Sequence, residues 1–137
     1  MTGSGLHVEV VGQGVPVVLT HGLGDGASTW AAMVPLVAER HRVVTWELRG
    51  HARSGAPLET GSYTRDGAIT DLLAVVTEAG APPHLVGHSL GGYLSLALAL
   101  RRPEVVLSLT MIASGPGFRD PAARAAYSMW PVLSGAP

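Results

Sequence analysis

The residues best suited to do chemistry are a serine and the glycines around it. Ser89 stands in the pattern G-x-S-x-G, with Gly87 and Gly91 two positions away on either side. A short apolar run, 84–88, precedes Ser89, and an apolar run with helical spacing, 90–102, follows it. A strand that turns abruptly into a helix strains its central residue, and glycines remove side chains that would collide there. This context favours an exposed nucleophilic serine over an ordinary Gly-rich turn with an unreactive one.

A nucleophilic serine needs hydrogen-bond donors for the oxyanion that forms during acyl transfer. The backbone N–H of Leu90 lies at the predicted helix N-terminus, where it would point toward such a charge. A second turn, His21-Gly22-Leu23-Gly24, directly follows the apolar run 15–20. We expect the N–H of Leu23 to supply the other donor of the oxyanion hole.

Composition limits the setting of this chemistry. The chain has 137 residues, 47% hydrophobic and 14% charged, which suits one folded domain and excludes a disordered chain. Its net charge of −1 gives no general attraction for nucleic acid or anionic lipid. Without cysteine it has no disulfides and no thiolate metal site, and we expect no metal. The start, 1–5, lacks the features of a signal peptide, and 85–100 is too short and interrupted to span a bilayer, so a cytoplasmic location is expected.

Strand and helix signals alternate along the chain. The predicted strands are 6–11, 15–20, 42–48, 84–88 and 105–112. The predicted helices are one capped by Ser28 and interrupted by Pro35, one over 64–79 that ends at Gly80, a buried one over 90–102, and one over 121–127. Strands separated by helices of this length predict an α/β fold whose sheet is mostly parallel, with crossover helices.

With these motifs in this order, the sequence resembles the α/β-hydrolase superfamily, in its esterase, lipase and lactonase-like branch. The matching segments are His21-Gly22, Arg49-Gly50-His51-Ala52-Arg53-Ser54, and Gly87-His88-Ser89-Leu90-Gly91-Gly92. The resemblance implies Ser89 as nucleophile and the N–H groups of Leu23 and Leu90 as oxyanion donors. The strand–turn–helix around Ser89, residues 87–91, corresponds to the segment called the nucleophile elbow in this family. Related branches that open epoxides carry Asp in place of the elbow serine, so Ser89 argues against them. The sequence departs from the family at Ala52, usually Gly, and at Trp46-Glu47, where an Asp is usual.

The resemblance also implies a catalytic acid and then a histidine after the serine, and here the sequence falls short. No histidine follows Ser89, and the only acids beyond it are Glu104 and Asp120, of which Asp120 reads as a helix N-terminal charge. Three histidines at expected strand starts should lie at the opposite end of the sheet: His7, His41 and His84. His88 is expected on the opposite face of the strand from Ser89. His21 and His51, which the resemblance assigns to loop shaping, stay open as alternative bases.

By the resemblance, residues 1–114 form the N-terminal part of the hydrolase core and 115–137 the start of an incomplete cap, truncated before the last strands. We expect a serine hydrolase that cleaves an ester, thioester or lactone through an acyl-enzyme at Ser89, inactive as this chain alone. An acyltransferase on the same elbow, and a non-catalytic remnant or interaction module, are the alternatives. The expected partner is a small-molecule acyl substrate, with no nucleic acid or membrane. The strand 105–112 would expose a sheet edge and favour self-association.

A cofactor site is the remaining alternative. The segment 22–27 also fits G-x-G-x-x-A, a dinucleotide-binding turn, and Glu47 stands near the distance at which such a site carries its acid. The elbow in the same chain favours hydrolysis instead, so no cofactor is expected.

Overall fold

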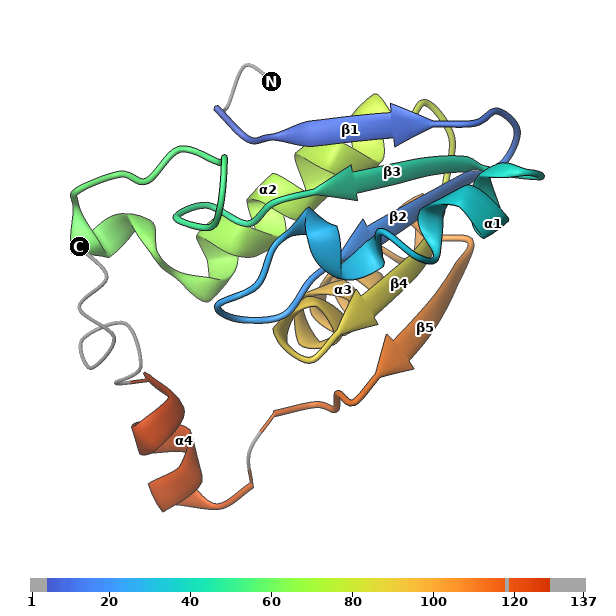
Figure 1. The fold of residues 1–137 in the computed structure, drawn as a ribbon. Coiled ribbons are helices and arrows are strands. Elements are labelled where there is room, and N and C mark those ends of the chain that lie inside the picture. Colours follow the sequence, from blue (N-terminus) through green and yellow to red (C-terminus); the bar gives the residue numbers. More distant parts are fainter. Residues whose placement is uncertain (1–4, 118, 129–137) are drawn as a thin grey trace.

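A single five-stranded sheet forms the centre of the computed structural model, which describes residues 5–117 and 119–128 (Figure 1). The strand order is β1-β3-β2-β4-β5. Four strands run parallel, and β1 is antiparallel to its neighbour β3. The strands are β1 (Val8–Val11), β2 (Pro16–Thr20), β3 (Arg42–Trp46), β4 (His84–His88) and β5 (Ser108–Ile112). The α/β class and the mostly parallel sheet are therefore confirmed.

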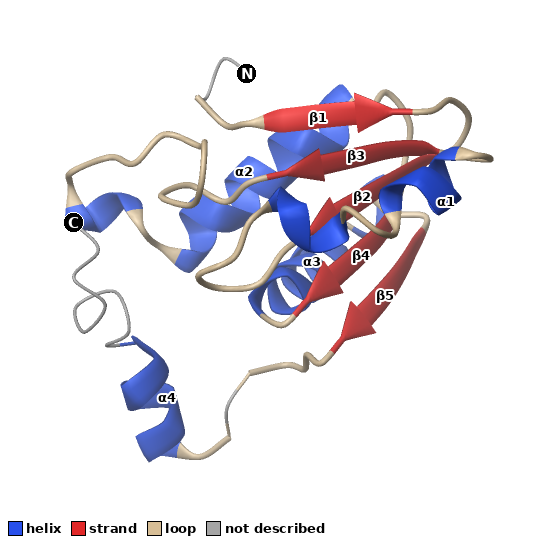
Figure 2. Cartoon of the chain, in the orientation of Figure 1, coloured by secondary structure: helices blue, strands red, loops and turns tan. Residues whose placement is uncertain are grey.

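Helices cover the sheet on both faces (Figure 2). The 3-10 helix η1 (Ala27–Trp30) and α1 (Val34–Ala38) lie on one face, and α2 (Arg65–Glu78) and α3 (Leu90–Arg101) on the other. Short 3-10 turns occur at η2 (Thr60–Ser62) and η3 (Pro103–Val105), and α4 (Pro121–Ser128) lies apart from the sheet. No helix among the described residues is long and apolar enough to cross a membrane.

The central strand β2 is buried on both faces, as its β-branched run predicts. Val17 and Leu19 join the apolar cluster under η1 and α1, which also contains Trp30. Val18 faces the larger cluster beneath α2 and α3, where it packs with Leu72 and other buried side chains. The two apolar clusters thus pack on opposite faces of the sheet, around β2 and its neighbour β4.

Local signals set both ends of α2, and its end at Gly80 is as expected. The Thr64 side chain accepts a hydrogen bond from the N–H of Gly67 at 3.0 Å, and Gly80, with φ +84°, follows the last turn. The first helical segment differs from its prediction in its cap, whereas the interruption at Pro35 is confirmed. Gly26, not Ser28, precedes η1 without a side-chain cap, and a separate helix α1 restarts with Pro35 in its first turn, where a missing N–H costs nothing.

Two expectations about strands are wrong. The chain reverses between Val11 and Pro16, so β1 runs antiparallel to β3, its neighbour in the sheet. His7 at the start of β1 therefore lies at the carboxyl end of β3, where the N–H of Glu47 donates to its carbonyl at 3.0 Å. His7 is therefore not at the far end of the sheet. Strand β5 begins only at Ser108, because the turn η3, which Pro103 opens, extends to Val105 at the start of the predicted strand.

The connections of the chain diverge at the ends of β2 and β4. From β2 the chain passes to β3 on one side of the sheet, whereas from β4 it passes to β5 on the other. Ligands of open α/β sheets bind outside the carboxyl ends of strands where the connections diverge in this way. The turn at 21–24 and Ser89 both follow these two strand ends.

Candidate active site

Ser89 occupies a strained turn between β4 and α3. Its backbone has φ +50° and ψ −114°, a conformation that L-residues rarely adopt and that requires support from the surroundings. Its N–H donates to the carbonyl of Ile112 at 2.9 Å. Its carbonyl accepts from the N–H of Tyr93 at 3.1 Å and from the Oγ of Ser114 at 2.6 Å. Both backbone polar groups of Ser89 are thus held in place.

The elbow glycines are required by close backbone approach. A Cβ at Gly87 would overlap the backbone of Gly91 and Gly92, so helix α3 could not start where it does. A Cβ at Gly91 would overlap the backbone of Thr20 and lie 2.6 Å from the carbonyl oxygen of His21. Only glycine at these positions lets the elbow pack against the end of β2.

The turn after β2 lies directly beside Ser89. A Cβ added to Gly22 would come within 3.4 Å of the Ser89 Cβ and 3.0 Å of the His88 Nδ1. His88 and Ser89 both border Gly22, because the strand alternation that predicted opposite faces stops at the turn. Within residues 5–117 and 119–128, neither Leu23 nor Leu90 donates its backbone N–H to a protein acceptor. Both donors predicted for the oxyanion are thus unengaged near the elbow.

His21 ties the turn after β2 to the end of β3. Its Nδ1 donates to the carbonyl of Gly22 at 2.7 Å, and its Nε2 accepts from the N–H of Leu48 at 3.0 Å, which identifies the Nδ1–H tautomer. The side chain is completely buried, and this burial lowers the pKa of His21, although the bond to Gly22 opposes the shift. Both ring nitrogens are engaged, so His21 supports the loop and is not poised to take a proton from Ser89.

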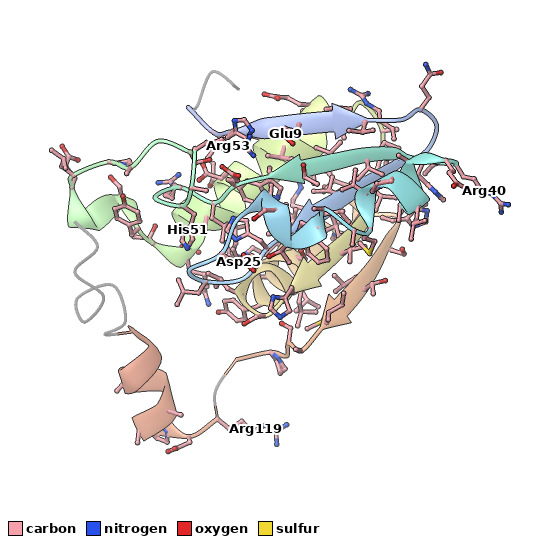
Figure 3. All side chains as sticks on the ribbon, viewed as in Figure 1. Glu9, Asp25, Arg40, His51, Arg53 and Arg119 are labelled. Atoms are coloured by element: carbon pink, nitrogen blue, oxygen red, sulfur yellow. The ribbon has the colours of Figure 1, made fainter. Side chains whose placement is uncertain are left out.

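His51 performs the same task from the neighbouring loop (Figure 3). Its Nε2 accepts from the N–H of Gly24 at 3.1 Å, and its Nδ1 lies 3.1 Å from the carbonyl oxygen of Arg49. The rings of His21 and His51 are 5.3 Å apart. The two histidines that the sequence left open as bases therefore brace the 21–24 turn between them.

A charged cluster shapes the loop that carries His51. Buried Glu47 accepts from the Arg53 side chain and, at 2.7 Å, from the Arg53 backbone N–H, and Arg53 also reaches Glu9 at 2.6 Å. Burial opposes ionisation of Glu47, but these hydrogen bonds outweigh it and lower the pKa of Glu47. Ala52, where the family usually has Gly, holds φ +44°. Of the two departures from the family pattern, Glu47 thus ties the loop to Arg53, and Ala52 takes a backbone conformation that is strained for alanine.

Asp25 fixes the start of η1 near the same strand ends (Figure 3). Its carboxylate accepts from the Thr29 hydroxyl and, at 2.9 Å, from the N–H of Gly26. The bond from Thr29, followed by that from Gly26, lowers the pKa of Asp25, which therefore stays anionic. Both oxygens are occupied by η1, so this acid serves the loop.

The other titratable residues lie elsewhere. The rings of His41 and His84 meet at 6.1 Å at the amino ends of β3 and β4, away from Ser89 as expected. Asp120 accepts from the N–H groups of Ala122 and Ala123 at the start of α4, which is the capping role that the sequence favoured. A cavity of about 350 Å³ near the Arg49–Asp71 ion pair includes none of the predicted site residues in its lining.

Residues from β5 were missed by sequence reasoning. Ile112 and Ser114 hold the backbone of Ser89, yet they stand more than twenty positions away and belong to no recognised motif. No local pattern marks them, because their role depends on β5 lying next to β4.

Comparison with known proteins agrees with this geometry. The family model described as "alpha/beta hydrolase fold" matches residues 15–131. The chain is 36% identical over 108 residues to "Putative carbamate hydrolase RutD" of Azorhizobium caulinodans, which covers 78% of the chain and 40% of that protein. It is 38% identical over 127 residues to "Pimeloyl-[acyl-carrier protein] methyl ester esterase" of Aeromonas hydrophila, covering 93% and 46%. The crystal structure of an epoxide hydrolase from Vigna radiata superposes with a TM-score of 0.80 at 27% identity, covering 95% and 41%. The chain thus spans less than half the length of these relatives.

Proposed function

The chain belongs to the α/β-hydrolase family, and from this premise we propose that the protein is a serine hydrolase of acyl substrates, with Ser89 as nucleophile. One observation carries the proposal: Ser89 is held at φ +50° beside the turn at Gly22, and the N–H groups of Leu23 and Leu90 make no hydrogen bond to any acceptor in the described part of the chain. A strained serine between a strand and a helix, with backbone N–H groups available near it, is an arrangement that supports acyl transfer. The substrate class is an ester, thioester or lactone.

The proposed reaction runs through an acyl-enzyme. The Ser89 Oγ attacks the substrate carbonyl carbon, and the Leu23 and Leu90 N–H groups hold the resulting oxyanion. The bond from the carbonyl carbon to the leaving oxygen or sulfur then breaks, and water later cleaves the ester to Ser89. A general base must take the Ser89 proton and return it to the leaving group. His21 and His51 brace the loop, and the family resemblance places the catalytic acid and then the histidine after the serine, where this sequence has no histidine. We therefore propose that this base and its acid partner come from outside these 137 residues.

Relatives and neighbours act on different bonds, and the elbow residue decides among them for this chain. The named relatives include an esterase and a carbamate hydrolase, whereas a structural neighbour is an epoxide hydrolase. A hydroxyl nucleophile suits attack on a carbonyl. Ser89 therefore supports carbonyl chemistry over epoxide opening.

A fluorophosphonate probe tests the proposal on the complete protein that contains this chain. We expect covalent labelling at Ser89, located by mass spectrometry, and loss of labelling in Ser89→Ala. Ser62→Ala, which changes a serine in η2, serves as the matched control and should label like the wild type. Absence of labelling at Ser89 would favour the non-catalytic remnant or interaction module. Labelling together with transfer of the acyl group to an added alcohol in preference to water would favour an acyltransferase.

A further inference from the structure

A hydroxyl from outside the elbow motif closes the turn at Ser89. The Oγ of Ser114 donates to the Ser89 carbonyl at 2.6 Å, although the two residues are 25 positions apart. This carbonyl begins helix α3, because it also accepts from the N–H of Tyr93. The peptide unit that Ser114 holds joins Ser89 to Leu90, whose N–H is the proposed oxyanion donor.

The second glycine after the elbow leaves room for this contact. A Cβ at Gly92 would lie 2.5 Å from the Ser114 Oγ and 2.6 Å from the Ser114 Cβ, closer than real contacts allow. Because Gly92 has no side chain, the Ser114 side chain occupies the space beside α3 where a Cβ would lie. The nearest atoms to an added Cβ at Gly87 or Gly91 are backbone, whereas at Gly92 they are those of the Ser114 side chain, followed by the Gly87 carbonyl oxygen at 2.9 Å.

The chain is bent to bring Ser114 to this position. Ile112 ends β5 and accepts the Ser89 N–H at 2.9 Å, and Ala113 then takes φ +48°, a conformation unfavourable for an alanine. This left-handed residue separates the two contacts to Ser89. Consequently the segment at the end of β5 binds both backbone polar groups of Ser89: the Ile112 carbonyl accepts its N–H, and the Ser114 hydroxyl donates to its carbonyl.

We propose that Ser114 is a positioning residue for the nucleophile: its hydroxyl, seated against Gly92, orients the Ser89–Leu90 peptide so that the nucleophile and the oxyanion N–H face the same carbonyl. The proposal rests on the proposed function for its kinetic consequence. Removal of the hydroxyl leaves the Ser89 carbonyl with Tyr93 alone. Small displacements of a nucleophile slow the chemical step more than they weaken binding.

The test compares two serine-to-alanine changes in the complete protein. Ser114→Ala and Ser108→Ala each remove one hydroxyl that makes a 2.6 Å hydrogen bond between the β5 segment and the β4 segment, but Ser108 meets His84 at the opposite end of the strand. With a fluorophosphonate, we expect Ser114→Ala to lower the maximal inactivation rate about tenfold without changing the concentration for half-maximal rate. Ser108→Ala should change neither. Thermal melting shows whether both variants fold.

The outcomes separate the two proposals. Equal inactivation rates for wild type and folded Ser114→Ala would overturn the positioning role while leaving Ser89 as nucleophile. A wild type that does not react would overturn the proposed function, and a crystal structure of Ser114→Ala then decides the positioning role. In that structure an unchanged Ser89 backbone near φ +50° would overturn it, and a relaxed one would support it.

Discussion

His21 and Leu48 connect the ends of two neighbouring strands through a single hydrogen bond. The Nε2 of completely buried His21 accepts the Leu48 N–H at 3.0 Å, while the Nδ1–H of the same ring donates to Gly22. Acceptance at Nε2 requires a neutral imidazole, because a protonated ring would present a donor to the Leu48 N–H. The loop beside Ser89 is therefore built around an uncharged histidine.

This neutral histidine makes stability depend on pH. Burial lowers the pKa of His21 in the folded state below its ordinary value of 6.5, so the unfolded chain binds this proton first as pH falls. We expect the free energy of unfolding to decrease below about pH 6.5, with a slope of up to about 1.4 kcal/mol per pH unit. Urea denaturation between pH 7.5 and 5 measures it, above the range of carboxyl groups with lowered pKa. His21→Gln should flatten the slope; an equal slope in both proteins would contradict the assignment.

The strain at Ser89 should be visible as lost stability. Glycine accepts φ +50° without a Cβ penalty, whereas alanine keeps the penalty and loses the same hydroxyl. We expect Ser89→Gly to unfold with about 1 kcal/mol more free energy than Ser89→Ala, after the entropic cost of glycine in the unfolded chain. Guanidinium denaturation of the two variants gives the difference. A Ser89→Gly no more stable than Ser89→Ala would show that the elbow is unstrained.

Gly91 should tolerate no side chain. Its Cβ would enter the carbonyls of Thr20 and His21, which are backbone atoms of the central strand and its turn and cannot move aside cheaply. We expect Gly91→Ala to lower the free energy of unfolding by about 3 kcal/mol or more. Gly61→Ala is the matched control, because a Cβ there has no neighbour within 4 Å and φ is not in the left-handed region. Similar stability of the two variants would refute the close approach.

The edge strand β5 should make this 137-residue chain self-associate. In the described part of the chain β5 pairs only with β4, and Thr110 and Ile112 are exposed on it. An open edge with exposed apolar groups favours pairing between molecules, and lysine on an edge strand opposes it. We expect oligomers by sedimentation velocity that Thr110→Lys shifts toward monomer. Leu58→Lys, at an exposed loop position, should leave them unchanged. A wild-type monomer at all concentrations would contradict this prediction.

The sequence by itself determined the features that depend on neighbours along the chain. The capped start of α2 at Thr64, its end at Gly80 and the strand-turn-helix around Ser89 follow from residues a few positions apart. The order of strand and helix signals predicted the α/β class for the same reason. Local backbone preferences operate over a few residues, so they can be read without knowledge of the fold.

Only the tertiary structure decided which distant groups meet. The pairing of β1 with β3, which brings His7 to the carboxyl end of β3, depends on β3 inserting between β1 and β2. The bracing of the 21–24 turn by His51 and the contact of Ser114 with the Ser89 carbonyl join residues 25 or more positions apart. Their alignment depends on the register of parallel strands, which is fixed by the packing of both sheet faces and by no local pattern.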